Sequence, residues 1–148
     1  MERRSLILAS GILGGLANAF GNSIGFFLSQ ETERSVQIHE EELGMKTRVH
    51  TKREVLMSGI LSFLSTLLAL LVLITPFIFL NIEISIVLTF ILGIILSSSM
   101  GSYVGKMSKQ NPLKTGLKYA VLAVVGASVS HAIGDLLSTI IPIHTNLV

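Results

Sequence analysis

Residues 11–30, GILGGLANAFGNSIGFFLSQ, decide the fold, because this stretch is apolar enough to cross a membrane and yet contains Asn18 and Asn22. Residues four apart lie on one face of a helix, so both amides are predicted to point the same way. The stretch also holds two pairs of small residues at the spacing that lets membrane helices approach closely. These pairs are Gly11 with Gly15 and Gly21 with Gly25. A helix that faces only lipid needs neither feature, so the sequence predicts an inward-facing helix in a packed bundle.

The composition is that of a membrane protein. The 148 residues are 50% hydrophobic and only 14% charged, with a mean hydropathy of +0.72, whereas about a quarter of the residues of a soluble domain are charged. Crossing ~30 Å of hydrocarbon takes about 20 helical residues, and several apolar runs reach that length. The sequence predicts an all-α, polytopic membrane bundle that forms a single domain over residues 1–148. Its four transmembrane helices are expected at residues 6–29, 55–80, 84–105 and 113–141, with a short acidic, helical, cytoplasmic insert at 31–54.

The basic residues predict the orientation. Lys and Arg concentrate between the first and second spans and between the third and fourth, and the basic loops of membrane proteins face the cytoplasm. Both termini are therefore expected outside, in the cell membrane if the source is prokaryotic. Arg3 and Arg4 precede the first span and oppose this orientation, but the two loops contain more basic residues.

Several classes of function are excluded or disfavoured. The net charge of +2 is small, and the basic residues flank apolar runs without forming a patch with aromatic residues, which argues against nucleic-acid binding. The absence of cysteine excludes disulfides, zinc–thiolate sites and thiol nucleophiles. The sequence has no recognisable nucleophile–base set and no glycine-rich phosphate loop. We therefore expect no enzyme and no permanently bound cofactor.

The acidic segment behind the first span is predicted to be helical up to Gly44, where glycine favours a helix end, and a second short helix is predicted at Lys46–Lys52. Carboxylates three and four residues apart, with a histidine among them, can offer several ligands to one divalent cation. The candidate metal ligands are Glu31, Glu33, His39, Glu40, Glu41 and Glu42. The alternative is a solvated helix beside the membrane, and spacing alone favours it, because runs of charge are usually solvated faces.

Two features within the spans are candidates for a pathway. Asn18 and Asn22 either line a polar path or bond across to another helix, and the second interpretation is the more common for asparagine in a membrane helix. Met100 follows three serines and could offer a thioether to a metal ion. A small, polar stripe of this kind is more often a surface on which helices pack.

His131 and Asp135 lie four residues apart on the last span. A carboxylate inside a membrane is costly, which makes it a functional candidate, and histidine titrates near neutral pH. The pair could therefore accept and release a proton during transport. The alternative is that Asp135 lies near the outer interface, since few residues follow it before Pro142. The two interpretations are evenly balanced.

These residues resemble the vacuolar iron transporter family, its prokaryotic branch included. The similarity covers about residues 11–137 and rests on small-residue motifs that occur in the order found in the family. They are Gly21-Asn22-Ser23 and Ser29-Gln30, then the acidic helix, Lys118, and the ending Gly126-Ala127-Ser128 to Ile133-Gly134.

The resemblance implies a homodimeric bundle that moves ferrous iron or manganese out of the cytosol against protons, with residues 31–54 at the position of the family's metal-gathering domain. The chain departs from the family because the first of the family's five spans has no counterpart in it, and because Asn18 and Asn22 stand where the family has a methionine and a glutamate. Hard cations bind neutral amides more weakly than carboxylates. The alternative function is therefore a non-transporting membrane scaffold or regulatory subunit that keeps the fold.

Overall fold

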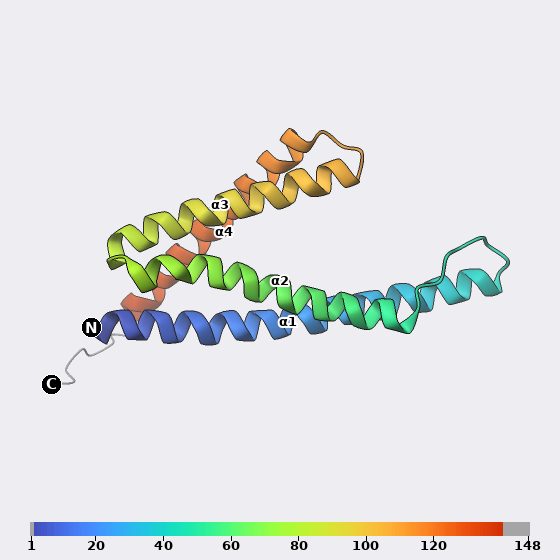
Figure 1. Ribbon diagram of the computed structural model, residues 1–148, viewed down its shortest axis with the longest axis horizontal. Helices are drawn as coiled ribbons and strands as arrows, with labels where there is room; N and C mark the ends of the chain where they lie inside the picture. The colour runs from blue at the N-terminus through green and yellow to red at the C-terminus, as the bar shows by residue number, and fades with distance from the viewer. Residues whose placement is uncertain (1, 141–148) are drawn as a thin grey trace. The chain divides into compact units, whose positions relative to one another are not determined.

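The computed structural model describes residues 2–140 and is all-helical over that range (Figure 1). Its helices are α1 (Glu2–Glu42), α2 (Lys52–Phe79), α3 (Ile82–Met107) and α4 (Pro112–Ile140). All four are long and apolar enough to cross a membrane. The predicted all-α class is confirmed, and each predicted span overlaps one helix. The predicted end of the fourth span at Ile141 lies outside the described residues.

The chain divides into two compact units, Met1–Ile86 and Val87–Val148. The first unit contains α1, α2 and the first turn of α3. The second unit contains the rest of α3 and α4. Each unit is thus built around one helical hairpin.

In the first unit, α1 and α2 pack side by side (Figure 1). Ala19 and Val55 are buried between them, and the Ser23 hydroxyl donates a hydrogen bond of 2.8 Å to the carbonyl of Gly59. Of the glycines in α1, Gly11 and Gly15 face the side chains of Ile74 and Leu70. The other predicted pair does not pack in this unit, because a methyl group added at Gly21 or Gly25 would meet nothing within 4 Å. Only one of the two glycine pairs therefore closes this hairpin.

The first helix runs without a break from the apolar stretch into the acidic segment and ends at Glu42. Gly44 follows in a left-handed conformation (φ +79°), as expected of a residue just beyond a helix end. Residues 45–51 are not helical, so the predicted short helix Lys46–Lys52 is wrong. Hydrogen bonds from Thr47 and His50 tie this non-helical segment to α1, and α2 begins directly at Lys52.

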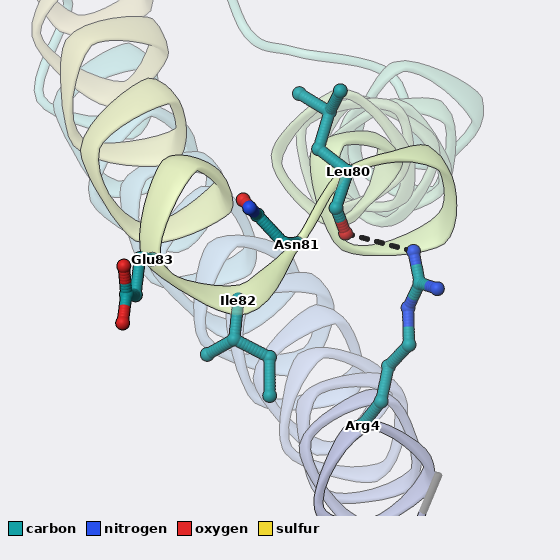
Figure 2. Close-up of a pocket in the computed structure, with 5 residues that line it drawn as sticks. All are labelled: Arg4, Leu80, Asn81, Ile82 and Glu83. Atoms are coloured by element: carbon teal, nitrogen blue, oxygen red, sulfur yellow. Dashed lines mark hydrogen bonds between the residues drawn. The ribbon is translucent and has the colours of Figure 1, made fainter.

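Arg4 closes the opposite end of the hairpin (Figure 2). Its guanidinium donates hydrogen bonds to the carbonyls of Phe77 (2.6 Å), Ile78 (2.7 Å) and Leu80 (2.8 Å). The last carbonyls of a helix have no partner within the helix, and a cation also interacts favourably with the helix C-terminus. Arg4 opposed the predicted orientation, because it is a basic residue at a terminus expected outside. Its bonds to the end of α2 give it a structural role at that position.

In the second unit, α3 and α4 approach closely at their connected ends. A methyl group added at Gly101 would lie 2.8 Å from the carbonyl oxygen of Thr115, and one added at Gly105 would lie 2.8 Å from the Thr115 hydroxyl. Gly116 faces the backbone of Ser98. Pro112 is the first residue of α4, where its missing N–H is not needed, and the Asn111 side chain accepts hydrogen bonds from the next backbone N–H groups. Backbone contact, available only to glycine, thus closes this hairpin.

Candidate functional site

The predicted metal ligands all lie on the last three turns of α1 and differ in their surroundings. The Glu33 carboxylate accepts hydrogen bonds from Gln30 (3.1 Å) and Gln37 (3.2 Å). Glu40 accepts one from the Thr47 hydroxyl at 2.9 Å. The Glu33 bonds lie within α1, and only the Glu40 bond joins the helix to the returning segment. Part of the bonding capacity of both carboxylates is thus already used.

The other candidates on this helix are more open. His39 Nδ1 lies 3.7 Å from Glu42 Oε2, and both side chains are largely exposed. Glu41 is exposed as well, and Glu31 is half-buried. Among the described side chains of residues 4–139 there is no group of three or more His, Asp or Glu that could hold a metal ion. The described chain therefore does not gather the six predicted ligands into one preformed site.

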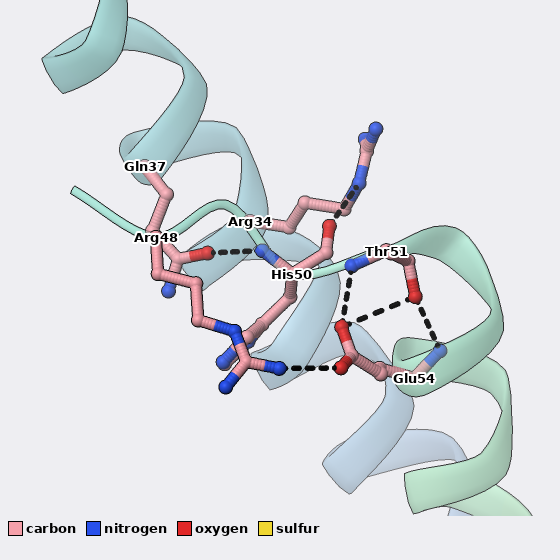
Figure 3. A network of polar contacts seen from close by, with 6 residues as sticks. All are labelled: Arg34, Gln37, Arg48, His50, Thr51 and Glu54. Carbon is pink, nitrogen blue, oxygen red and sulfur yellow. Dashed lines mark hydrogen bonds and ion pairs between the residues drawn. The ribbon is translucent and has the colours of Figure 1, made fainter.

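A polar network that the sequence analysis did not predict joins the end of α1 to the start of α2 (Figure 3). The backbone of His50 is held from both sides, since its N–H donates to Gln37 Oε1 at 2.8 Å and its carbonyl accepts from Arg34 Nε at 2.9 Å. Thr51 and Glu54 then form a capping box at the start of α2. Glu54 also pairs with Arg48 at 2.9 Å.

This network could have been found in part from the sequence. A threonine followed three residues later by a glutamate, ahead of an apolar run, is the signature of a capping box, and it marks the start of α2 at Lys52. The contacts of His50 with α1 carry no such signature, because they join residues 13 and 16 positions apart. They depend on the course that the chain takes after Gly44.

The two amides of α1 do not share one environment. Both are exposed, but Asn22 Nδ2 donates a long hydrogen bond of 3.4 Å to the Thr66 hydroxyl on α2, whereas no described hydrogen bond involves the Asn18 side chain. Asn18 lies on the same face as three glycines, Gly14, Gly21 and Gly25. A methyl group added at any of these glycines would meet nothing within 4 Å. This open stripe of α1 is defined by Gly14, Asn18, Gly21 and Gly25. Within its own unit no side chain covers the three glycines.

On α3, Ser98 and Gly101 belong to the surface that packs against α4, while Met100 is 58% exposed. The Ser99 hydroxyl donates to the carbonyl of Ile95 one turn back. The serine stripe is thus at least partly a packing surface. The neighbour of Met100, Gly101, faces Thr115 and Tyr119 of α4, whereas His131 lies more than three helical turns beyond Tyr119 on that helix.

His131 and Asp135 form the pair that their spacing predicts. His131 Nε2 lies 3.6 Å from Asp135 Oδ2, at the i, i+4 spacing of α4. Their side chains are 83% and 73% exposed. The backbone carbonyl of Asp135 accepts hydrogen bonds from Ser138 and Thr139. Neither side chain is buried in its unit.

Comparison with known proteins gives one distant similarity. The chain is 27% identical over 134 residues to an uncharacterized protein of Methanocaldococcus jannaschii, in an alignment that covers 83% of this chain and 70% of the relative. No family model matches the chain, and no solved structure matches it. None of these comparisons indicates a function for the chain.

Proposed function

We propose that this chain is a multi-pass membrane protein that moves divalent metal cations, Fe²⁺ or Mn²⁺, out of the cytosol, and that it is related to the vacuolar iron transporters. The observation that carries the proposal is the continuity of α1. This 41-residue helix bears polar amides within its apolar part and carboxylates at its charged end. A single rigid helix thereby connects a place for metal capture to a polar position within the membrane.

The membrane part of the proposal assigns four spans, with the two basic loops in the cytoplasm and both termini outside, in the cell membrane of a prokaryotic source. At 1.5 Å per residue, Glu41 would lie about 20 Å beyond Leu28, where the apolar run of α1 ends. That distance exceeds the depth of the headgroup region. Glu40, Glu41 and Glu42 would therefore reach the cytosol and meet metal ions first.

A homodimer is part of the proposal. The open stripe of α1 has the small residues that let a second helix approach closely. In such a dimer Asn18 would line the path of the ion, together with Asn22 and Met100. His131 and Asp135 would exchange the proton that drives export.

The alternative is a non-transporting membrane scaffold or regulatory subunit. One observation favours it: in the part of the chain with described side chains, residues 4–139, no three carboxylate or imidazole groups gather around a possible ion. Neutral amides at positions 18 and 22 also bind hard cations weakly. In this alternative the carboxylates of α1 form a solvated face.

The first experiment is titration of the purified chain in detergent with Fe²⁺, Mn²⁺ and Zn²⁺, beside a variant in which Glu40, Glu41 and Glu42 are all alanine. Binding to the parent chain that disappears in this variant would support capture by α1. The control is Glu83→Ala, which removes an exposed carboxylate at the start of α3 and should leave binding unchanged. If neither Fe²⁺ nor Mn²⁺ binds the parent chain, the scaffold function replaces this proposal.

A second experiment separates transport from a structural role of Asn22. Export of Fe²⁺ or Mn²⁺ would be measured in vesicles under a pH gradient for Asn22→Ala and for Thr66→Val, which removes the only described side-chain partner of Asn22. A pathway role predicts that Asn22→Ala slows transport with the fold intact while Thr66→Val keeps the rate. Equal losses in both variants would reduce Asn22 to a packing contact.

A further inference from the structure

The turn between α3 and α4 carries charge of one sign. Four lysines lie in or beside it, and no Asp or Glu occurs between Glu83 and Asp135. The lysines are Lys106, Lys109, Lys114 and Lys118. The turn therefore presents a concentrated positive charge directly next to two apolar helices.

The structure leaves these charges available. All four lysines are exposed. The ion pairs among the described side chains of residues 4–139 join His39 to Glu42, Arg48 to Glu54 and His131 to Asp135, and none of them involves a lysine of this turn. Their charge is thus uncompensated within the described chain.

The turn is also a rigid support. The backbones of α3 and α4 touch at Gly101, Gly105 and Gly116, and Asn111 caps the start of α4. Lys114 and Lys118 are four residues apart and share one face of that helix. Lysines on a fixed backbone lose less conformational entropy when they bind one ligand jointly than lysines on a mobile loop do.

Two tyrosines flank the lysines at the same end of the hairpin. Tyr103 is 62% exposed and Tyr119 is 36% exposed. Tyrosine is enriched at the level of lipid headgroups, where its ring lies in apolar surroundings and its hydroxyl reaches water. The lysines therefore belong at the depth of the phosphate groups, if the hairpin spans the membrane.

We propose that the α3–α4 turn binds the phosphate headgroups of anionic phospholipids. A lipid fits better than a free phosphate ion, because the lysines adjoin long apolar helices and tyrosines that would contact the acyl chains. Clusters of basic residues next to a membrane span attract anionic lipids by about fivefold in affinity per residue. The proposal rests on the membrane insertion proposed above and is independent of metal transport.

The connection between α1 and α2 provides a matched control within the same chain. It also contains exposed lysines, Lys46 and Lys52, but six glutamates lie between positions 31 and 54. One of these, Glu54, pairs with Arg48. Removing two charges there should change the attraction for anionic lipid much less.

The experiment compares binding of dioctanoyl-phosphatidylglycerol and dioctanoyl-phosphatidylcholine to the full chain in neutral detergent by native mass spectrometry. The parent chain should prefer the anionic lipid. The variant Lys114→Gln/Lys118→Gln should bind phosphatidylglycerol about 25-fold more weakly, and the control Lys46→Gln/Lys52→Gln within about twofold of the parent. Circular dichroism of both variants would establish that the helices are retained.

Three outcomes would overturn the proposal. They are equal binding of the two lipids, an equal loss in the two double variants, and displacement of phosphatidylglycerol by an equal concentration of inorganic phosphate, which would make the ligand a free anion. Alkaline extraction of the chain from membranes tests insertion separately. A chain that resists extraction but shows no lipid preference would refute this inference and leave the proposed function standing.

Discussion

The two hairpins of this protein are closed by different means. In the α1–α2 hairpin the closest glycine, Gly15, meets the flexible end of Leu70, and polar side chains fasten the charged end. In the α3–α4 hairpin Gly101 and Gly116 meet backbone atoms of the facing helix. A side chain can rotate away from an added methyl group, but a backbone cannot move without separating the helices. The second hairpin should therefore tolerate substitution less well than the first.

The connections within the two hairpins also differ, in length and in charge. The first continues α1 well beyond its apolar part into a run of glutamates, and the chain returns through a non-helical segment whose Arg48 pairs with Glu54 at the start of α2. The second is short, and its charged residues are all lysines. A connection that contains both acidic and basic residues can form ion pairs within itself. A connection whose charges are all positive can form ion pairs only with a negatively charged partner. The first is thus suited to an exposed structure and the second to a charged surface.

The largest expected effect is that of Gly101→Ala. The new methyl group would lie 2.7 Å from Tyr119 Cβ and 2.8 Å from the Thr115 carbonyl oxygen, and overpacking of this kind costs about 1–3 kcal/mol. Unfolding of the purified chain in micelles by SDS, followed by circular dichroism, would measure the loss. Gly93→Ala is the control, because it lies in the same helix with nothing within 4 Å. If the two variants are equally stable, backbone contact does not close this hairpin.

A smaller effect is expected at the polar end of the first hairpin. Thr51→Ala removes the side chain that accepts from the Glu54 N–H at 3.2 Å, and the loss of such a cap typically costs about 1 kcal/mol. The same unfolding assay applies. Thr51→Ser keeps the hydroxyl and should restore most of the stability, so a serine variant as unstable as the alanine variant would show that the cap is not the cause.

The smallest effect is expected for Gly15→Ala. The methyl group would meet Leu70, whose Cγ lies 2.9 Å away, but Leu70 can rotate, and alanine is favoured over glycine in a helix by about 0.5–1 kcal/mol. We expect a net change of at most about 1 kcal/mol. Gly21→Ala is the matched control in open space and should not destabilise the chain. A loss at Gly15 that exceeds the loss at Gly101 would reverse the comparison between the hairpins.

Much of the fold could be predicted from the sequence because its cause is local. The number and approximate bounds of the apolar helices depend on runs of hydrophobic residues, and the end of α1 depends on Gly44 with its positive φ. The spacing of His131 and Asp135 also needed only helix geometry to place the two side chains near each other. Helical periodicity is a property of the chain itself, so it can be read without knowledge of the partner helix.

Only the tertiary structure decided which small residues pack and which polar residues meet. Gly11 and Gly21 begin the same sequence pattern, yet only Gly11 faces α2. The segment after Gly44 was predicted to be a short helix, but it is non-helical, and the backbone of His50 is bonded to Arg34 and Gln37 of α1. The six predicted metal ligands share a helix without converging on one point. In each case the outcome depends on contacts between residues distant in the chain, and no local pattern encodes which face of a helix its neighbour will cover.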